Sequence, residues 1–228
     1  MSGRIRGLIR RRRWRTITAF AISITPTSGL RKVFMKILLG YHIGRNTKIA
    51  FGVFFNVDTA LIGSNVTLSR WNAFYGPVQI EIGHGTFFGQ KNQIMCGWAT
   101  TDNWAEDRMY GRRLTVGDRC LINEGHLFDI VGSIDIGDGT WVAGFRSQLM
   151  THGASVKDRD ITIGKNCFLG SAVLIAPGSA IGDDNIVAMG ALVTRKIPGN
   201  NVIIGGVPAK VLRERKPDDE HSFVKEWS

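Results

Sequence analysis

Acidic residues are missing from the first quarter of this 228-residue chain, and the first of them is Asp58. Residues 1–36 carry ten Lys and Arg side chains, whereas residues 37–228 hold 19 basic and 19 acidic side chains. The net charge of +10 therefore belongs to an N-terminal arm, and the remainder of the chain is neutral. This distribution excludes the broad basic field with which a folded domain attracts nucleic acid, so no nucleic acid partner is expected.

Cysteine and long apolar runs are also scarce. The three cysteines, at positions 96, 120 and 167, are too few for a disulfide framework and favour a reducing compartment. No apolar run approaches the roughly 18 residues that a membrane-spanning helix needs. A secretory signal is disfavoured because Thr16, Thr18 and Ser23 dilute the apolar part of the arm and no clear cleavage site follows. These features predict a cytoplasmic protein.

The arm combines basic and apolar residues. An arginine-rich run is followed by an apolar patch over 17–24, and residues 30–39 repeat an apolar face at spacings of three and four. The second pattern predicts a short amphipathic helix. One interpretation is peripheral attachment of residues 1–36 to an anionic membrane, such as the inner membrane surface. The other is packing on the body of the protein or on a neighbouring subunit, with the arginines in solvent.

A dipeptide of an apolar residue and glycine organises the remainder of the chain. Apolar residues continue from these dipeptides at steps of six, although Gln148 breaks one run. The dipeptides begin at Ile43, Ile62, Ile82, Val116, Ile136, Ile163 and Ile181, and the cleanest run is Ile163, Leu169, Ile175, Ile181, Val187 and Val193.

A period of six matches neither a helix nor an alternating strand. It indicates a coil with three short flat sides, each placing one residue inward, and tight corners of Gly, Asn and Asp. The prediction is an all-β fold, a parallel β-helix shaped as a triangular prism. We expect a basic amphipathic arm over 1–40, the repeat over 41–207, and a C-terminal helix and tail over 208–228.

Three hexads make a turn of 18 residues, and two turns are much longer than that. The excess residues fall near 97–113 and near 150–160. Loops that leave a regular solenoid wall can build clefts, so these two segments are candidate functional regions.

Several motifs resemble those of the hexapeptide-repeat acyltransferases, most closely the branch that O-acetylates sugars and bacterial polysaccharides. The resemblance is strong over about 114–216 and good as a repeat over 41–95. The motifs are Thr151-His152, residues 161–170, Ala176-Pro177-Gly178, Ile181-Gly182-Asp183, and residues 193–198 and 205–211.

This resemblance implies a left-handed β-helix, a homotrimer with active sites between prisms, and acetyl-CoA as co-substrate. By position, His152 matches the catalytic histidine of the family. Met189 replaces a smaller residue, and Arg195 and Lys210 exchange the more usual Lys and Arg. The positions that match the CoA channel are Ser171, Met189, Thr194, Arg195, Lys210 and Arg213.

The residues themselves suggest how acetyl transfer could proceed. A neutral imidazole can take the proton of a sugar hydroxyl as it attacks a thioester, and the imidazolium can then protonate the leaving thiolate. No covalent intermediate is needed, and backbone N–H groups would hold the oxyanion. Cations near the end of the coil, including Lys196, would meet the CoA phosphates. The alternative for that cluster is a solvated face of a C-terminal helix.

Acceptor-binding residues are expected on the turn before His152 and in the first loop. His126, Glu124 and Asp129 are candidate polar contacts, although a corner histidine satisfied by local hydrogen bonds is an equal alternative. Trp98 and Trp104 could stack on a sugar face, or they could pin a loop or an interface.

Three further functions are compatible with the same repeat. An N-acetyltransferase on an amino sugar would share the donor chemistry, and a prism without catalysis would serve as a scaffold. A zinc-dependent carbonic anhydrase needs three convergent histidines, and His84, His126 and His152 lie on widely separated turns. No metal is therefore expected. The sequence leaves open the acceptor sugar, its hydroxyl, and whether it is a polymer or a lipid-linked or nucleotide-linked precursor.

Overall fold

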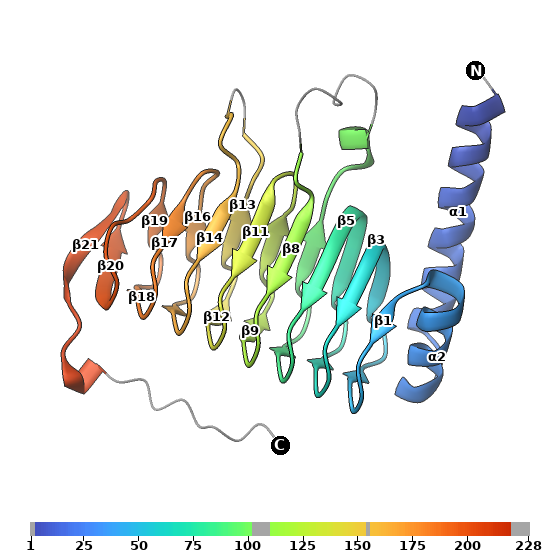
Figure 1. Cartoon of the computed structure of the whole chain (residues 1–228), viewed down its shortest axis with the longest axis horizontal. Helices are drawn as coiled ribbons and strands as arrows, with labels where there is room; N and C mark the ends of the chain where they lie inside the picture. The colour runs from blue at the N-terminus through green and yellow to red at the C-terminus, as the bar shows by residue number, and fades with distance from the viewer. Residues whose placement is uncertain (1–2, 102–109, 154–155, 220–228) are drawn as a thin grey trace.

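The computed structural model describes residues 3–101, 110–153 and 156–219. Two helices at one end precede a long solenoid of short parallel strands (Figure 1). The N-terminal elements are α1 (Gly3–Ser23), α2 (Ser28–Leu39), β1 (His42–Ile43), β2 (Lys48–Ile49), β3 (Phe54–Ile62), β4 (Thr67–Leu68), β5 (Ala73–Ile82), β6 (Phe87–Phe88), β7 (Gln93–Met95) and the 3-10 helix η1 (Trp98–Thr101). The middle strands are β8 (Arg113–Val116), β9 (Leu121–Glu124), β10 (Leu127–Asp129), β11 (Ser133–Ile136), β12 (Trp141–Phe145) and β13 (Gln148–Met150). The C-terminal elements are β14 (Ile161–Ile163), β15 (Phe168–Leu169), β16 (Leu174–Ile175), β17 (Ala180–Ile181), β18 (Ile186–Val187), β19 (Leu192–Val193), β20 (Val202–Gly206), β21 (Ala209–Glu214) and the 3-10 helix η3 (Pro217–Asp219).

Each coil contributes one strand to each of three faces. Face 1 contains β8, β11, β14 and β17, face 2 contains β9, β12, β15 and β18, and face 3 contains β10, β13, β16 and β19. The long strands β3 and β5 bend from face 3 into face 1. We call the corners after these faces the first, second and third edges, with examples at 164–167, 170–173 and 176–179.

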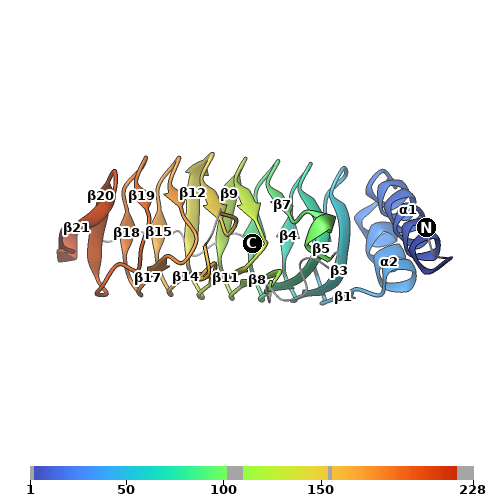
Figure 2. The same ribbon diagram turned by 90° about the horizontal axis from the view of Figure 1, so that it is seen from above.

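The handedness of the coil can be followed in Figure 1. Strands of face 1 lie in front and run downward, and the chain returns upward behind them while it advances from right to left (Figures 1 and 2). This is a left-handed sense, opposite to the usual right-handed crossover of parallel strands. The predicted all-β, left-handed parallel β-helix is therefore confirmed.

The core is the column of apolar residues that recur at steps of six in the sequence. Ile163, Leu169 and Ile175 on successive faces are each at most 1% exposed. The break at Gln148 has a local cause, since the second edge of that coil contains five residues, 143–147, instead of four. The extra residue shifts the register, so that Leu149 points inward and pairs with Ile175 while Gln148 is exposed.

Close stacking of the coils explains the glycines at the first edge. A Cβ atom on Gly44 would lie 2.5 Å from the backbone carbon of Gly63 in the next coil. The neighbouring corner positions hold left-handed residues such as Asn46 and Asn166, with φ of 55° and 51°. Asparagine tolerates this conformation better than most residues, which is why it recurs at these corners.

The two helices close the N-terminal end of the solenoid. The predicted amphipathic helix over 30–39 is confirmed as α2, which buries Met35 and Leu39 against the first coil. Helix α1 packs on α2 and β3, and it buries Ala19 and Ile22. No helix within the described ranges has the length and apolar content that crossing a membrane requires.

The C-terminal end differs from the predicted helix. Residues Ala209–Glu214 form strand β21, which pairs antiparallel with β20 and ends the sheet of face 2. A single 3-10 turn, η3, follows at Pro217–Asp219. The open edge of the last coil exposes unpaired backbone groups, and a returning strand satisfies them where a helix would not.

Candidate functional site

A pocket of about 430 Å³ lies at the third edge, where strands of face 3 end. In-register pairing stacks Tyr75 on Met95, Met95 on Asp129, and Asp129 on Met150 in successive coils. These outward side chains follow the inward core residues by one position, so the regular ladder itself forms the floor of the pocket. His152 lies at one end of this row, two residues beyond Met150.

The first loop forms another wall of the pocket. Gly97, Ala99 and Thr100 line it from the segment around η1, and Tyr110 lines it from the returning chain. Arg112 donates a hydrogen bond from Nη1 to the Thr100 carbonyl at 2.8 Å, which ties the two ends of this loop together.

His152 is held by the residue before it and faces a carboxylate. Thr151 is fully buried, and its Oγ1 accepts hydrogen bonds from the N–H groups of Val131 and Gly132 at 2.7 and 2.9 Å. The Nδ1 atom of His152 lies 3.8 Å from Oδ2 of Asp129, within ion-pair range and slightly long for a hydrogen bond. The imidazole is 70% exposed, so Nε2 is available to a substrate.

Asp129 is the half-buried member of this pair. Burial raises the pKa of its carboxyl group, and the neighbouring His152 opposes that rise. A carboxylate beside Nδ1 favours the tautomer in which Nδ1 carries the hydrogen and Nε2 can accept a hydrogen bond. Asp129 was expected to contact the acceptor, and its position fits a partner of His152 equally well.

The acceptor-binding role predicted for His126 is corrected by its position. The side chain is 1% exposed at the second edge and does not line the pocket. Its Nδ1 accepts a hydrogen bond from the Ser147 N–H at 3.1 Å, and burial lowers its pKa to about 4. A neutral imidazole inside the corner therefore serves the solenoid and cannot touch an acceptor.

The other acceptor candidates lie apart from the pocket. Glu124 is exposed at the second edge. The Arg12 guanidinium carbon lies 4.5 Å from the centroid of the Trp98 ring. The Tyr75 ring meets the Trp98 ring edge to face, with 6.0 Å between the two centroids. Trp98 thus pins the first loop to α1, the alternative that the sequence left open. Trp104 lies outside the described residues.

The candidate CoA-binding residues fall in three places. Thr194, Arg195 and Lys196 lie at the third edge with His152, and Lys196 pairs with Asp158 of the second loop at 3.2 Å. Ser171 and the 77%-exposed Met189 lie at the second edge, across the whole width of face 3.

The remaining two candidates are on β21. Lys210 is exposed there. Arg213 makes a bidentate contact with the Asp219 carboxylate at 2.6 and 2.8 Å, so its guanidinium is already partnered. One chain therefore does not bring all seven predicted side chains to a single cleft.

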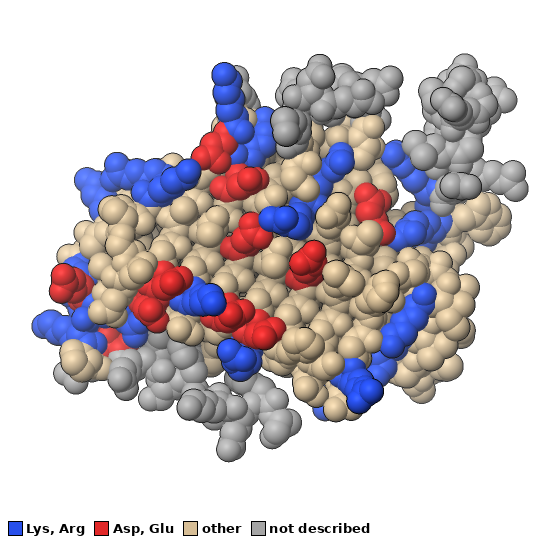
Figure 3. All heavy atoms as spheres, viewed as in Figure 1, with Lys and Arg blue, Asp and Glu red and all other residues tan. Residues whose placement is uncertain are grey.

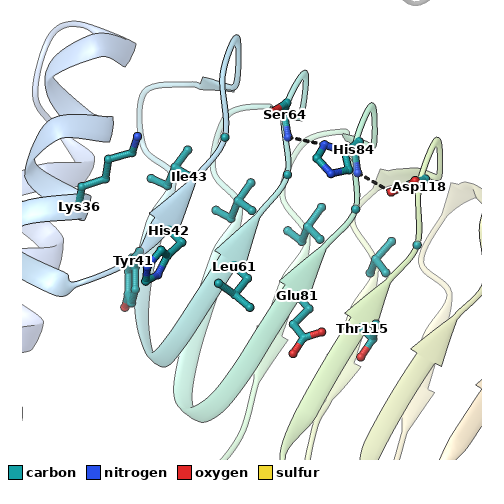
Figure 4. A pocket seen from close by; sticks show the side chains of 17 residues that line it. Lys36, Tyr41, His42, Ile43, Leu61, Ser64, Glu81, His84, Thr115 and Asp118 are labelled. Carbon is teal, nitrogen blue, oxygen red and sulfur yellow. Dashed lines mark hydrogen bonds between the residues drawn. The ribbon is translucent and has the colours of Figure 1, made fainter.

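A second, larger hollow of about 840 Å³ lies on face 1 beside α2 (Figure 4). His84 bridges two coils there, since its Nδ1 accepts from the Ser64 N–H at 3.0 Å and its own N–H donates to Asp118 at 2.7 Å. His84, His126 and His152 thus occupy the first, second and third edges, and they do not converge within one chain.

Comparison with known proteins finds similar sequences for part of the chain. No family model matches the chain. The chain is 45% identical over 67 residues to galactoside O-acetyltransferase of Escherichia coli, which covers 29% of this chain and 32% of that protein. It is 30% identical over 122 residues to a chloramphenicol acetyltransferase of Agrobacterium fabrum, which covers 50% of this chain and 57% of that one. Over these segments the chain is similar to proteins that are named as acetyltransferases.

The likeness to these two acetyltransferases is partial in length. The chain spans less than two thirds of each of the two curated relatives. A solved hexapeptide-repeat acetyltransferase from Vibrio cholerae aligns over 94% of both chains, with 20% identity and a TM-score of 0.48.

Several residues that line the pocket are not predicted by the six-residue repeat. Tyr75, Met95 and Cys96 belong to ordinary repeats, and nothing in their local sequence marks them as pocket residues. The signal that could have found them is their place at the end of a face 3 strand beside a long loop. Burial and hydrogen bonding make Cys96 a structural thiol, and burial raises its pKa.

Proposed function

We propose that the protein transfers an acetyl group from acetyl-CoA to a hydroxyl group of a saccharide. The observation that carries this proposal is the pairing of His152 with Asp129 beside a pocket of about 430 Å³. The homology to acetyltransferases, one of them a galactoside O-acetyltransferase, supports the donor and the acceptor class. A surface or exo-polysaccharide, or its precursor, is the proposed acceptor.

In this mechanism His152 acts as a general base through Nε2. It removes the proton of the sugar hydroxyl as the oxygen attacks the thioester carbon, and it then protonates the departing CoA thiolate. Asp129 orients the ring and stabilises its charged form. Both substrates lie in one cleft, so that proximity supplies part of the rate and no acyl-enzyme is required.

The proposal includes a homotrimer, because one prism offers only part of the cleft. His152 and Thr194 lie at the third edge, whereas Ser171 and Met189 lie at the second edge of the same chain. A neighbouring prism that brings its second edge to this third edge would unite the two sets and cover the exposed imidazole. Acetyl-CoA would then lie along the contact, with Arg195, Lys196 and Lys210 near its phosphates.

The decisive assay follows thiol release from acetyl-CoA with a panel of neutral and amino saccharides. We expect turnover with a hydroxyl acceptor and a loss of about 10²–10⁴-fold in kcat for His152→Ala. His42→Ala, an exposed histidine of the first coil, is the matched control and should keep full turnover. Acetylation of amines alone would assign an N-acetyltransferase, and acetyl-CoA binding without turnover would assign a scaffold.

Mixed trimers test the shared site. His152→Ala and Met189→Glu affect opposite edges, so a trimer assembled from both inactive variants regains one complete contact. Recovery of thiol release after co-refolding supports a site between prisms. If the two variants form mixed trimers and these remain inactive, the site lies within one chain.

The cytoplasmic location and the peripheral contact of residues 1–36 with the inner membrane stay predictions.

A further inference from the structure

The helical cap formed by α1 and α2 has two apolar faces, and only one of them packs on the solenoid. On α1 the buried residues Ala19 and Ile22 face the first coil. Trp14, Ile17 and Phe20 recur at every third position on the opposite side of the helix, and each is 58–60% exposed. An ordinary surface helix carries polar residues on that side.

Helix α2 repeats the arrangement. Arg31, Met35 and Leu39 point toward the solenoid and are at most 6% exposed. Val33 and Ile37 point the other way and are 47% and 73% exposed. Because both helices pack on the same coil, their outer faces point away from the solenoid, beyond its N-terminal end (Figure 2). We call this the cap surface; it comprises Trp14, Ile17, Phe20, Ile24, Leu30, Val33, Ile37 and Leu38, all between 43% and 73% exposed.

The charge around the cap surface has one sign. The arm holds ten cations and no anion before Asp58. Exposed Arg13 is next to Trp14 on α1, whereas Lys36 lines the hollow on face 1. Over the solenoid, by contrast, Asp and Glu side chains are interspersed with Lys and Arg (Figure 3). Three arginines of the arm are used inward. Arg15 donates to the Val57 carbonyl, Arg12 donates to Thr101 Oγ1 at 2.9 Å, and Arg31 donates to the Ile49 carbonyl at 3.0 Å.

We propose that the cap surface binds a membrane that contains anionic lipids, with α1 and α2 lying in the interfacial plane. Large exposed apolar side chains on helices that carry cations and no acidic residue match an acyl-chain boundary beneath negative headgroups. A second copy of the chain fits less well, because a symmetric contact would place two acid-free arms against each other. Nucleic acid would satisfy the cations and leave the apolar face in water.

This attachment would set the orientation of the protein. Helix α1 rises on the same side of the prism as η1, the short green turn that follows β7 (Figure 1). Arg12 joins α1 directly to the first loop, which lines the pocket beside His152. A membrane-bound cap would therefore place the first loop at the membrane-proximal end of the prism and the later coils farther from the lipid.

Vesicle flotation of the full chain tests the inference. We expect binding to vesicles of phosphatidylcholine mixed with phosphatidylglycerol, weak binding to phosphatidylcholine alone, and release at high salt. Ile17→Glu with Ile37→Glu should weaken binding by about a hundredfold, roughly tenfold for each lost apolar side chain. The matched control is Leu212→Glu, which alters a 62%-exposed apolar residue at the opposite end and should bind as the unaltered chain does.

A second variant isolates the charge. Replacing Arg10, Arg11 and Arg13 by Gln while retaining Arg12 should remove the preference for anionic vesicles and leave the melting temperature unchanged. The inference is overturned if the full chain binds no vesicle at low salt, or if Ile17→Glu with Ile37→Glu leaves flotation unaltered. It is also overturned if that pair only dissociates an assembly of copies, or if RNA binds and vesicles do not. None of these readouts depends on acetyl transfer, so failure here and failure of the proposed function are distinguishable.

Discussion

His126 is one member of a hydrogen-bonded ladder that climbs the second edge of the solenoid. Asn92 Oδ1 accepts from the His126 N–H at 2.9 Å, His126 Nδ1 accepts from the Ser147 N–H at 3.1 Å, and Ser147 Oγ accepts from the Val173 N–H at 3.2 Å. His126 can accept the hydrogen bond from the Ser147 N–H only while its Nδ1 atom is unprotonated. Its Nε2 atom is buried and has no hydrogen-bond partner among the residues that the structure describes.

Protonation of His126 is therefore opposed in the folded state and free in the unfolded state. Burial lowers the pKa from 6.5 to about 4, against a smaller opposing effect of the Val142 backbone. Because the pKa of His126 is lower in the folded state than in the unfolded state, the stability that neutral His126 contributes is complete above pH 6.5. It is lost as the pH falls toward 4. Linkage gives a loss of about 2 kcal/mol at pH 5 and about 3 kcal/mol once the pH is below 4.

The test compares the unaltered chain with His126→Asn. Asparagine can accept the Ser147 N–H, as Asn92 accepts the N–H of His126, and it does not titrate. We expect similar melting temperatures at pH 7.5. At pH 5 the unaltered chain should lose about 4–8 °C more than the variant, since about 2 kcal/mol corresponds to that shift in a chain of this size. Identical pH profiles for the two proteins would refute the buried, neutral state of His126.

Three further predictions follow from other contacts. Asp129→Asn should lower kcat at least about tenfold, because it removes the carboxylate beside His152. Burial raises the Asp129 pKa above the ordinary carboxyl value near 3.9, so protonation of Asp129 should lower the rate of the unaltered chain at a pH above that value. The variant should lack this acidic decrease in the pH–rate profile. Arg12→Gln should speed amide hydrogen exchange over 96–101, since it removes a hydrogen bond and a cation–π contact worth about 1–2 kcal/mol together; unaltered exchange would contradict this anchoring role. Leu169→Ala should cost about 2–5 kcal/mol in chemical denaturation, whereas Lys165→Ala, which removes an exposed ion pair with Asp138, should cost at most about 1 kcal/mol.

The pocket shows where inference from sequence ends. Asp129 and His152 are both visible as polar residues at strand ends, yet their pairing depends on in-register stacking of two coils and on the buried Thr151. His126 has the same local appearance as a site residue. Its burial results from the geometry of the corner, which a single sequence does not reveal.

The sequence by itself determined the architecture, because a six-residue period with one apolar residue in each hexad can bury its core only in a three-sided coil. The same period located both long loops and His152. Tertiary structure alone decided which polar residues meet. Side chains that touch come from successive coils, about 18 or more residues apart in the sequence, and each of the three edges points in its own direction. It also decided that the helices of the arm pack by one apolar face and expose the other, because spacing along a helix does not say which face the solenoid covers.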